Sequence, residues 1–151
     1  MITSLNMFDT LEKYKNKTKG EQFDFLSDLI EDGDIRILKF ILNPVFNYPI
    51  PVKDKTQSIL HSACYAGNLQ IIKMIVNNKL VDINDKDYLG RTPLMMSVIF
   101  GHYKSVEFLL SIGANPNIPN IHGDYPIEAA VDRKNDIIIE LLEKYAKPLN
   151  K

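Results

Sequence analysis

The segment 87–119 constrains the fold of this chain most strongly, because its turn and helix signals each stand where they have a mechanical role. Gly90 lies in a predicted turn, where glycine adopts a positive φ angle at little cost. Thr92 offers an N-cap hydroxyl, and Pro93 suits the first helical position, which needs no N–H group. Gly101 then ends this helix and begins the turn into a second one. The segment therefore predicts two short helices that are joined by a tight turn.

The second helix of the segment is predicted from the spacing of its apolar residues. Val106, Leu109 and Leu110 follow the i, i+3, i+4 pattern of an amphipathic helix. Gly113 is expected to end this helix in the left-handed conformation. Weaker copies of the same pattern lie on both sides of the segment at nearly the same spacing, so the sequence predicts an array of repeats.

The repeats resemble those of the ankyrin family, whose signature is a turn, the motif T-P-L-H-x-A and two helices, with a period of about 33 residues. This chain has T-P-L-M-M-S from Thr92, S-I-L-H-S-A from Ser58 and P-I-E-A-A from Pro126. The resemblance implies an all-α ankyrin-repeat solenoid of stacked helix-turn-helix units with short projecting β-hairpins. It also implies an extended binding surface rather than a pocket that holds a reaction.

The resemblance predicts a single ankyrin-repeat domain over residues 1–151. Its expected parts are an N-terminal cap helix with a polar linker (1–20), a degenerate repeat (21–52), two regular repeats (53–86 and 87–119) and a C-terminal capping repeat (120–151). The cap helix is suggested by Leu5, Phe8, Leu11 and Tyr14, which are spaced three apart. This helix either covers the first repeat or forms a mobile tail with a binding role of its own.

Two positions depart from the family pattern. The repeat 53–86 lacks a closing glycine, so Asn77 or Asn78 is expected in the left-handed conformation, which asparagine tolerates best after glycine. In the last repeat Tyr125 replaces the capping threonine, so Asp124 is expected to cap the helix instead.

The overall composition is that of an ordinary globular protein with almost no net charge. The net charge of −1 gives no general attraction to nucleic acid or to an anionic membrane. The sequence has no signal-peptide pattern and no apolar run of membrane-spanning length. We therefore expect a monomeric cytoplasmic protein that binds neither nucleic acid nor membranes, or one that acts in host cytoplasm if it is a secreted effector.

The sequence predicts no catalytic or metal site, and we expect no cofactor. His61 and His102 stand where the family's histidines form hydrogen bonds with the turns between repeats. His122 is expected to be solvated at a hairpin tip, and Cys64, the single cysteine, is expected to be buried and inert. The acidic residues near Asp34 lack the spacing of a calcium loop.

The candidate binding residues occupy the variable positions of the family, at the hairpin tips and the outer ends of the first helices on the concave face. Carried onto this sequence, the predicted partner-binding residues are Tyr65, Lys86, Tyr88, Leu89, Arg91, Ile99, Phe100, Ile121, Asp132 and Arg133. Arg91 and Arg133 are expected to add polar specificity, and the expected anchors are Tyr65, Tyr88, Leu89, Phe100 and Ile121. The alternative is that Ile99 and Phe100 fold inward against the neighbouring repeat.

The sequence thus predicts a non-enzymatic module that binds a partner protein as an adaptor, inhibitor or assembly factor. One alternative is a pathogen or viral effector that binds a host protein. A second alternative is a structural role through self-association. A third is a fragment of a larger enzyme, against which the sequence offers no activated nucleophile and no phosphate loop.

Overall fold

The computed structural model describes residues 4–48, 50–51, 53–79 and 81–146, and their side chains from residue 7 onward. Within these residues the chain is helical, and the helices alternate with loops and turns. The helices are α1 (Ser4–Lys15), α2 (Lys19–Glu31), α3 (Ile35–Ile41), α4 (Ile59–Ala66), α5 (Leu69–Asn77), α6 (Pro93–Ile99), α7 (Tyr103–Ser111), α8 (Pro126–Asp132) and α9 (Asp136–Tyr145). A single 3-10 turn, η1 (Pro44–Phe46), follows α3.

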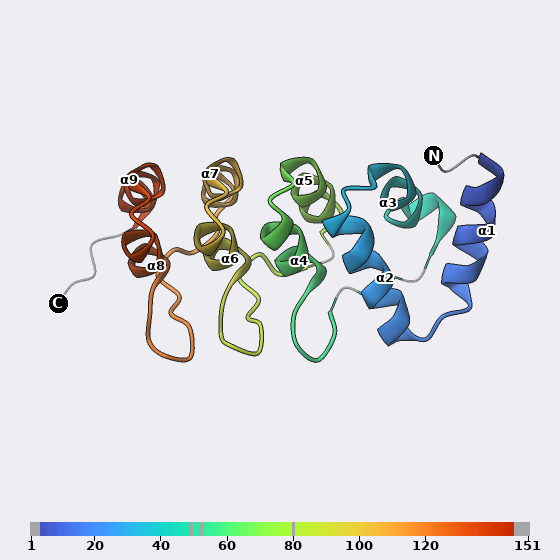
Figure 1. Ribbon diagram of the computed structural model, residues 1–151, viewed down its shortest axis with the longest axis horizontal. Coiled ribbons are helices and arrows are strands. Elements are labelled where there is room, and N and C mark those ends of the chain that lie inside the picture. Colours follow the sequence, from blue (N-terminus) through green and yellow to red (C-terminus); the bar gives the residue numbers. More distant parts are fainter. Residues whose placement is uncertain (1–3, 49, 52, 80, 147–151) are drawn as a thin grey trace.

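The helices form two layers that run along the length of the molecule (Figure 1). The inner layer consists of α2, α4, α6 and α8, each of which packs against the next. The outer layer consists of α3, α5, α7 and α9, and each outer helix packs against the inner helix that precedes it in the chain. Four helix pairs therefore stack in chain order, and the predicted all-α repeat fold is confirmed.

Three loops project from the inner layer in the same direction, one before each of α4, α6 and α8 (Figure 1). Each is closed by a backbone hydrogen bond of 3.0 Å, namely Asp54 N–H to Gln57 O, Asp87 N–H to Arg91 O, and Asn120 N–H to Asp124 O. In the described part of the chain, the only β-type pairing is one isolated bridge between Lys53 and Ser58. The projecting hairpins are thus tight turns with very little strand.

The ends of α6 and α7 follow the sequence prediction. The Thr92 hydroxyl accepts a hydrogen bond from the Met95 N–H group at 3.2 Å, so it caps α6. Gly101 and Gly113 both adopt positive φ angles, of 75° and 97°, at the turns that follow these two helices. Because a side chain at either position would strain the backbone, glycine makes these short turns possible.

The left-handed residue after α5 is Lys79, with a φ angle of 53°, so the prediction of Asn77 or Asn78 was wrong. Asn78 keeps a right-handed conformation, with a φ angle of −75°. Its side-chain Nδ2 donates to Met74 O at 2.8 Å and so satisfies one of the last carbonyl groups of the helix. The left-handed residue that ends the helix therefore comes one residue later than the sequence predicts.

Asp124 does not cap α8, so the prediction that it would replace the capping threonine was also wrong. The backbone N–H group of Tyr125 instead donates to the Glu128 carboxylate at 2.6 Å. Asp124 belongs to the preceding turn, where its carboxylate accepts a hydrogen bond from Asn120 Nδ2 at 3.0 Å. The glutamate in the first helical turn thus takes over the capping role.

Helix α1 packs against α2 and α3 at the end of the stack. Leu11 and Tyr14 are fully buried, and the Tyr14 ring lies 5.5 Å from the ring of Phe25. Phe8 is 66% exposed, contrary to its predicted place in the apolar stripe, and the side chain of Leu5 lies outside the described residues. The described part of α1 therefore covers the first helix pair. The spacing of three residues predicts one buried residue too many, because Phe8 is exposed.

Candidate interaction surface

The projecting turns are joined to one another by backbone hydrogen bonds. Tyr88 N–H donates to Thr56 O at 2.8 Å, and Ile121 N–H donates to Leu89 O at 3.0 Å. Gly90 allows the second of these contacts, because a Cβ atom there would lie 2.9 Å from the backbone nitrogen of Ile121. The turns therefore form a continuous row along the inner layer. We call the exposed residues of this row and of the inner helices the inner surface.

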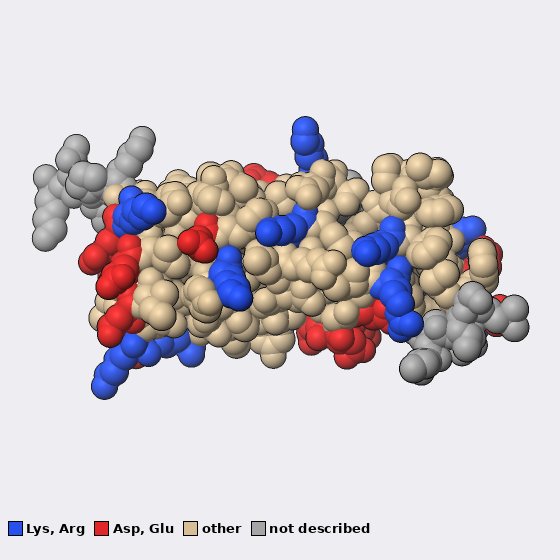
Figure 2. All heavy atoms as spheres, turned by 90° about the horizontal axis from the view of Figure 1, so that it is seen from above, with Lys and Arg blue, Asp and Glu red and all other residues tan. Residues whose placement is uncertain are grey.

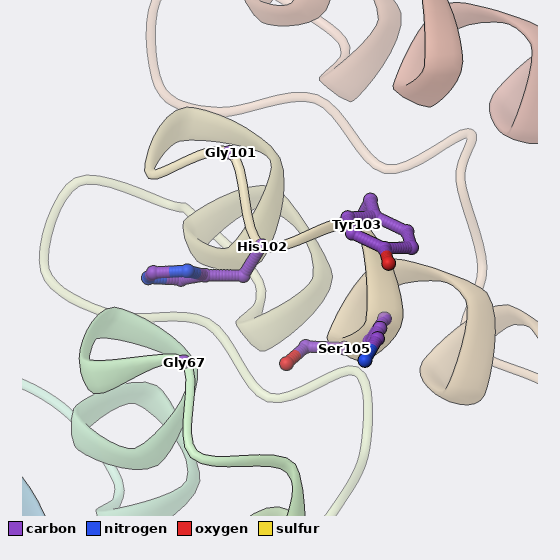
Figure 3. Close-up of a pocket in the computed structure, with 6 residues that line it drawn as sticks. Gly67, Gly101, His102, Tyr103 and Ser105 are labelled. Atoms are coloured by element: carbon purple, nitrogen blue, oxygen red, sulfur yellow. The ribbon is translucent and has the colours of Figure 1, made fainter.

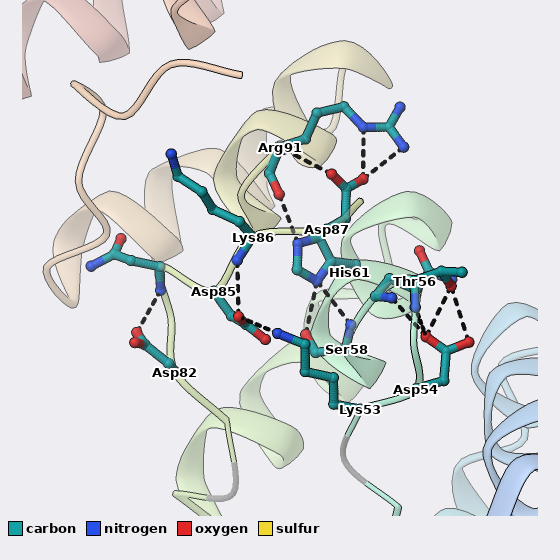
Figure 4. Close-up of polar contacts among 12 residues, drawn as sticks. Lys53, Asp54, Thr56, Ser58, His61, Asp82, Asp85, Lys86, Asp87 and Arg91 are labelled. Atoms are coloured by element: carbon teal, nitrogen blue, oxygen red, sulfur yellow. Dashed lines mark hydrogen bonds and ion pairs between the residues drawn. The ribbon is translucent and has the colours of Figure 1, made fainter. Parts of the chain in front are cut away.

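His61 fixes α4 to the turn of the next repeat (Figure 4). Its Nε2 donates to Arg91 O at 2.9 Å, while its Nδ1 accepts hydrogen bonds from the N–H and hydroxyl groups of Ser58. Because the Arg91 carbonyl group can only accept and the Ser58 N–H group can only donate, Nε2 carries a proton, Nδ1 carries none, and the ring is neutral. The second framework histidine, His102, bridges repeats in the same way, with Nε2 2.8 Å from Tyr65 O. The structural role predicted for both histidines is confirmed.

Acidification is expected to weaken the fold through His61. Burial lowers the pKa of His61, and the hydrogen bond to Arg91 O only partly opposes this effect. The unfolded chain therefore binds a proton at a higher pH than the folded chain. The stability that neutral His61 contributes is complete above about pH 6.5 and is lost as the pH falls through the lower folded-state pKa. Urea unfolding at pH 7.5 and at pH 5.5 measures this loss.

The control for this prediction is a His61→Gln variant, whose amide does not titrate. It is expected to be less stable than the wild type at pH 7.5 but to lose less stability between the two pH values. An equal loss in both proteins would show that another group is responsible.

Arg91 is already bound within its own turn. Its Nη2 and Nε lie 2.7 and 2.8 Å from Asp87 Oδ2, and the same carboxylate accepts hydrogen bonds from the N–H groups of Leu89 and Arg91 (Figure 4). The Arg91 side chain is only 22% exposed. Arg91 therefore shapes the turn first, and it presents less free charge than a solvated arginine. Lys86 also serves the framework, since its Nζ donates to Pro119 O at 3.3 Å.

The apolar residues of the predicted binding set divide into two groups by exposure. Tyr88 and Ile121 project at the turn tips, and Tyr88 is 65% exposed. Phe100 is 42% exposed at the end of α6, and its ring meets the exposed Tyr65 ring edge-on, with 4.6 Å between the ring centres. Leu89 and Ile99 are half-buried. The inward alternative thus describes Ile99 in part, whereas Phe100 reaches solvent.

A groove of about 580 Å³ lies between the turns and helices of the last two repeats. It is lined by Leu89, Arg91, Ile99, Asn120, His122, Ala129, Asp132 and Arg133. Asp132 and Arg133 are exposed at its C-terminal side and supply charges of both signs. The structure therefore brings half of the predicted surface residues into one concave feature, which we call the inner groove.

Some lining residues of the inner groove were missing from the predicted set. Asn120 occupies in its turn the place that Asp87 occupies one repeat earlier, and this place lies outside the variable positions from which the predicted set was taken. Ala129 belongs to the helical motif and has no distinctive chemistry of its own. Asn120 directly precedes the variable position 121, and Ala129 lies about one helical turn before the variable position 132, so closeness to these positions is the sequence signal for both.

The remaining candidate side chains show no arrangement for chemistry. Burial raises the pKa of the Cys64 thiol to about 12, and the thiol is fully enclosed. His122 is exposed, as expected. The described residues contain no group of three or more His, Cys, Asp or Glu side chains placed to hold a metal ion. Among the same residues, no helix has the length and apolar character that crossing a bilayer requires.

A stack of helix pairs with projecting turns and histidine bridges between repeats defines a repeat solenoid that presents a surface. The family model for ankyrin repeats matches residues 26–120, with three copies. The chain therefore belongs to the ankyrin-repeat family, and the pair α8–α9 adds a fourth unit beyond the matched region.

The relatives include viral and bacterial ankyrin repeat proteins. A putative ankyrin repeat protein of Acanthamoeba polyphaga mimivirus is 34% identical over 147 residues, which is 92% of this chain and 20% of the relative. The putative ankyrin repeat protein YahD of Escherichia coli is 32% identical over 55% of this chain and 44% of the relative. One from Rickettsia felis is 32% identical over 62% of this chain and 24% of the relative. The chain thus spans less than half the length of each of these relatives.

Proposed function

We propose that this protein is a non-enzymatic interaction module that binds a partner protein through its inner surface. The observation that carries the proposal is the gathering of exposed aromatic and aliphatic side chains on that surface, next to the inner groove. Tyr65, Tyr88, Phe100 and Ile121 are all exposed there. Large apolar side chains beside an arginine are typical of the residues that dominate binding energy in protein interfaces.

Rigid presentation is the proposed mechanism. The turns are tied to their neighbours by Tyr88 N–H and Ile121 N–H, His61 fixes α4 to the turn at Arg91, and His102 joins the α6–α7 connection to the end of α4. A surface that is already ordered loses little conformational entropy when a partner binds. The protein would act by covering a surface of its partner, as an adaptor, an inhibitor or an assembly factor, and it would work as a cytoplasmic monomer without affinity for nucleic acid.

A second candidate is a viral or bacterial effector that binds a host protein. The observation that favours it is the match over 92% of the chain with a mimivirus protein, together with the match to a Rickettsia felis protein. The physics of binding would be the same, and only the origin of the partner would differ.

Affinity capture with three forms of the protein tests the proposal. The wild type is compared with a Tyr88→Ala/Phe100→Ala variant and with Phe8→Ala, which removes an exposed aromatic ring from α1 instead. Lysates of the source cell and of its host are used in parallel, and circular dichroism checks that each form is folded. A protein captured by the wild type and by Phe8→Ala, but not by the double variant, is the expected result.

Two outcomes would oppose the proposal. Capture that is equal for all three forms would place binding elsewhere on the molecule. If nothing is captured and light scattering shows a dimer that depends on concentration, self-association would be the better account.

A further inference from the structure

A second groove lies in the outer layer, between α7 and α9, and the proposed function does not use it. It has a volume of about 370 Å³ and is lined by Tyr103, Glu107, Ile137, Glu140, Leu141 and Lys144. Leu141 is half-buried, while Tyr103 and Ile137 are exposed. We call it the outer groove. It is apolar in its interior and carries charged residues around it.

Ile137 breaks a pattern that the other outer helices keep. The second residue after the N-cap is Arg36 in α3, Gln70 in α5 and Lys104 in α7, and each is exposed. The corresponding residue in α9 is Ile137, which is 60% exposed. Ile137 thus places a large aliphatic side chain at a position that is polar in the other three helices, and it lines the outer groove together with the exposed Tyr103.

The charges at the outer groove are also unbalanced. Glu107 and Glu140 are exposed, and neither takes part in an ion pair among the described residues. The Lys144 ammonium group lies 5.7 Å from the centre of the Tyr145 ring. Along the outer layer, Lys and Arg side chains are spread over α3, α5 and α7, and several acidic side chains lie at the α9 end together with basic ones (Figure 2). The acidic residues on α9 are Asp136, Glu140 and Glu143, at the i, i+4, i+7 spacing of one helix face.

We propose that the outer groove is a second docking site, which takes a short segment of a partner protein with an aliphatic or aromatic anchor beside a lysine or arginine. The anchor would fill the space between Tyr103, Ile137 and Leu141. The cation would lie near Glu107 and Glu140, whose unpaired carboxylates make an acidic segment a poor ligand. Because the outer groove and the inner surface belong to different layers, the protein could hold two partners at once (Figure 1).

The test uses phage-displayed random peptides of twelve residues, selected on the full chain in 150 mM salt. We expect enriched peptides with an aromatic or aliphatic residue next to lysine or arginine. A synthetic peptide of the enriched sequence should bind the wild type, and its affinity should fall at least about tenfold for Ile137→Lys and for Glu140→Lys. Ile137→Lys installs the residue that α7 carries at the same position, so it is compatible with the fold.

Two matched controls locate the binding. Asp9→Lys makes the same charge change at an exposed position of α1, at the opposite end of the stack, and it should leave the affinity within about twofold, because salt screens distant charges. The Tyr88→Ala/Phe100→Ala variant should bind the peptide as the wild type does.

Three results would overturn the proposal. The enriched peptides could be acidic, or they could lose binding only in the Tyr88→Ala/Phe100→Ala variant, which would assign them to the inner surface. Selection could also yield no peptide that depends on Ile137 or Glu140. Finally, light scattering could show a dimer that Ile137→Lys converts to a monomer, in which case a second copy of this chain would be the occupant.

Discussion

A Gly67→Ala substitution is expected to lower the free energy of unfolding by about 3 kcal/mol. Gly67 has a φ angle of 71°, and a Cβ atom there would lie against the imidazole of His102, closer than real Cβ atoms approach a ring. The ring cannot move away freely, because its Nε2 is bound to Tyr65 O at 2.8 Å. Figure 3 shows the His102 ring facing the turn at Gly67. The substitution thus combines backbone strain with a clash at a bridge between repeats.

Gly33→Ala is the matched control for this prediction. Gly33 has the same φ angle of 71°, but the nearest atom to an added Cβ would be Asn68 Nδ2, at 3.5 Å. This variant should therefore lose only the cost of the left-handed conformation, about 1 kcal/mol. Urea unfolding, followed by circular dichroism, measures both values.

A double-mutant cycle separates the two costs of the Gly67→Ala substitution. In a His102→Ala background the clash is absent, so Gly67→Ala should cost about 1 kcal/mol there, as at Gly33. If the cost stays the same with and without the imidazole, contact with His102 does not explain the effect.

Removal of Tyr88 and Phe100 together is expected to weaken binding of the partner at least about a hundredfold. Each side chain is large, apolar and exposed on the inner surface, and residues of this kind can contribute about 2 kcal/mol or more each when they anchor an interface. Phe100→Ala also removes the ring that supports Tyr65, with which it is in edge contact at 4.6 Å. The measurement is calorimetry or biolayer interferometry with the purified partner.

Phe8→Ala is the control for the binding measurement and should change the dissociation constant by less than about twofold. Tyr88 is 65% exposed, whereas Phe100 is 42% exposed and pairs with Tyr65, so thermal unfolding should show a double variant that is folded and less stable by about 1 kcal/mol. A double variant that is folded and still binds with wild-type affinity would exclude these residues as anchors.

Local turn and cap chemistry explains why much of the fold could be predicted. Thr92, Gly101 and Gly113 act through their own backbone geometry, so a single sequence reveals their roles. The prediction of the left-handed residue after α5 failed, because more than one neighbouring residue can adopt that conformation. Asn78 uses its side chain to bind Met74 O and leaves the left-handed position to Lys79, a choice that depends on the exact end of the helix.

The candidate surface was harder to predict, because exposure and pairing depend on neighbouring repeats. The repeat register placed Leu89, Ile99 and Arg91 at surface positions. Their neighbours partly bury the two aliphatic residues, and Asp87 binds the Arg91 guanidinium. The outer groove could not be predicted at all, since it arises where Ile137 and Leu141 meet Tyr103 across two helices.

Photo-crosslinking in cells tests most directly whether the inner surface binds a protein partner. Benzoylphenylalanine would replace Tyr88 in one form and Gln70 in another, because Gln70 is exposed on α5 in the outer layer and does not line the outer groove. The account predicts a discrete crosslinked protein from position 88 and none from position 70. No crosslink from position 88, or the same pattern from both positions, would contradict it.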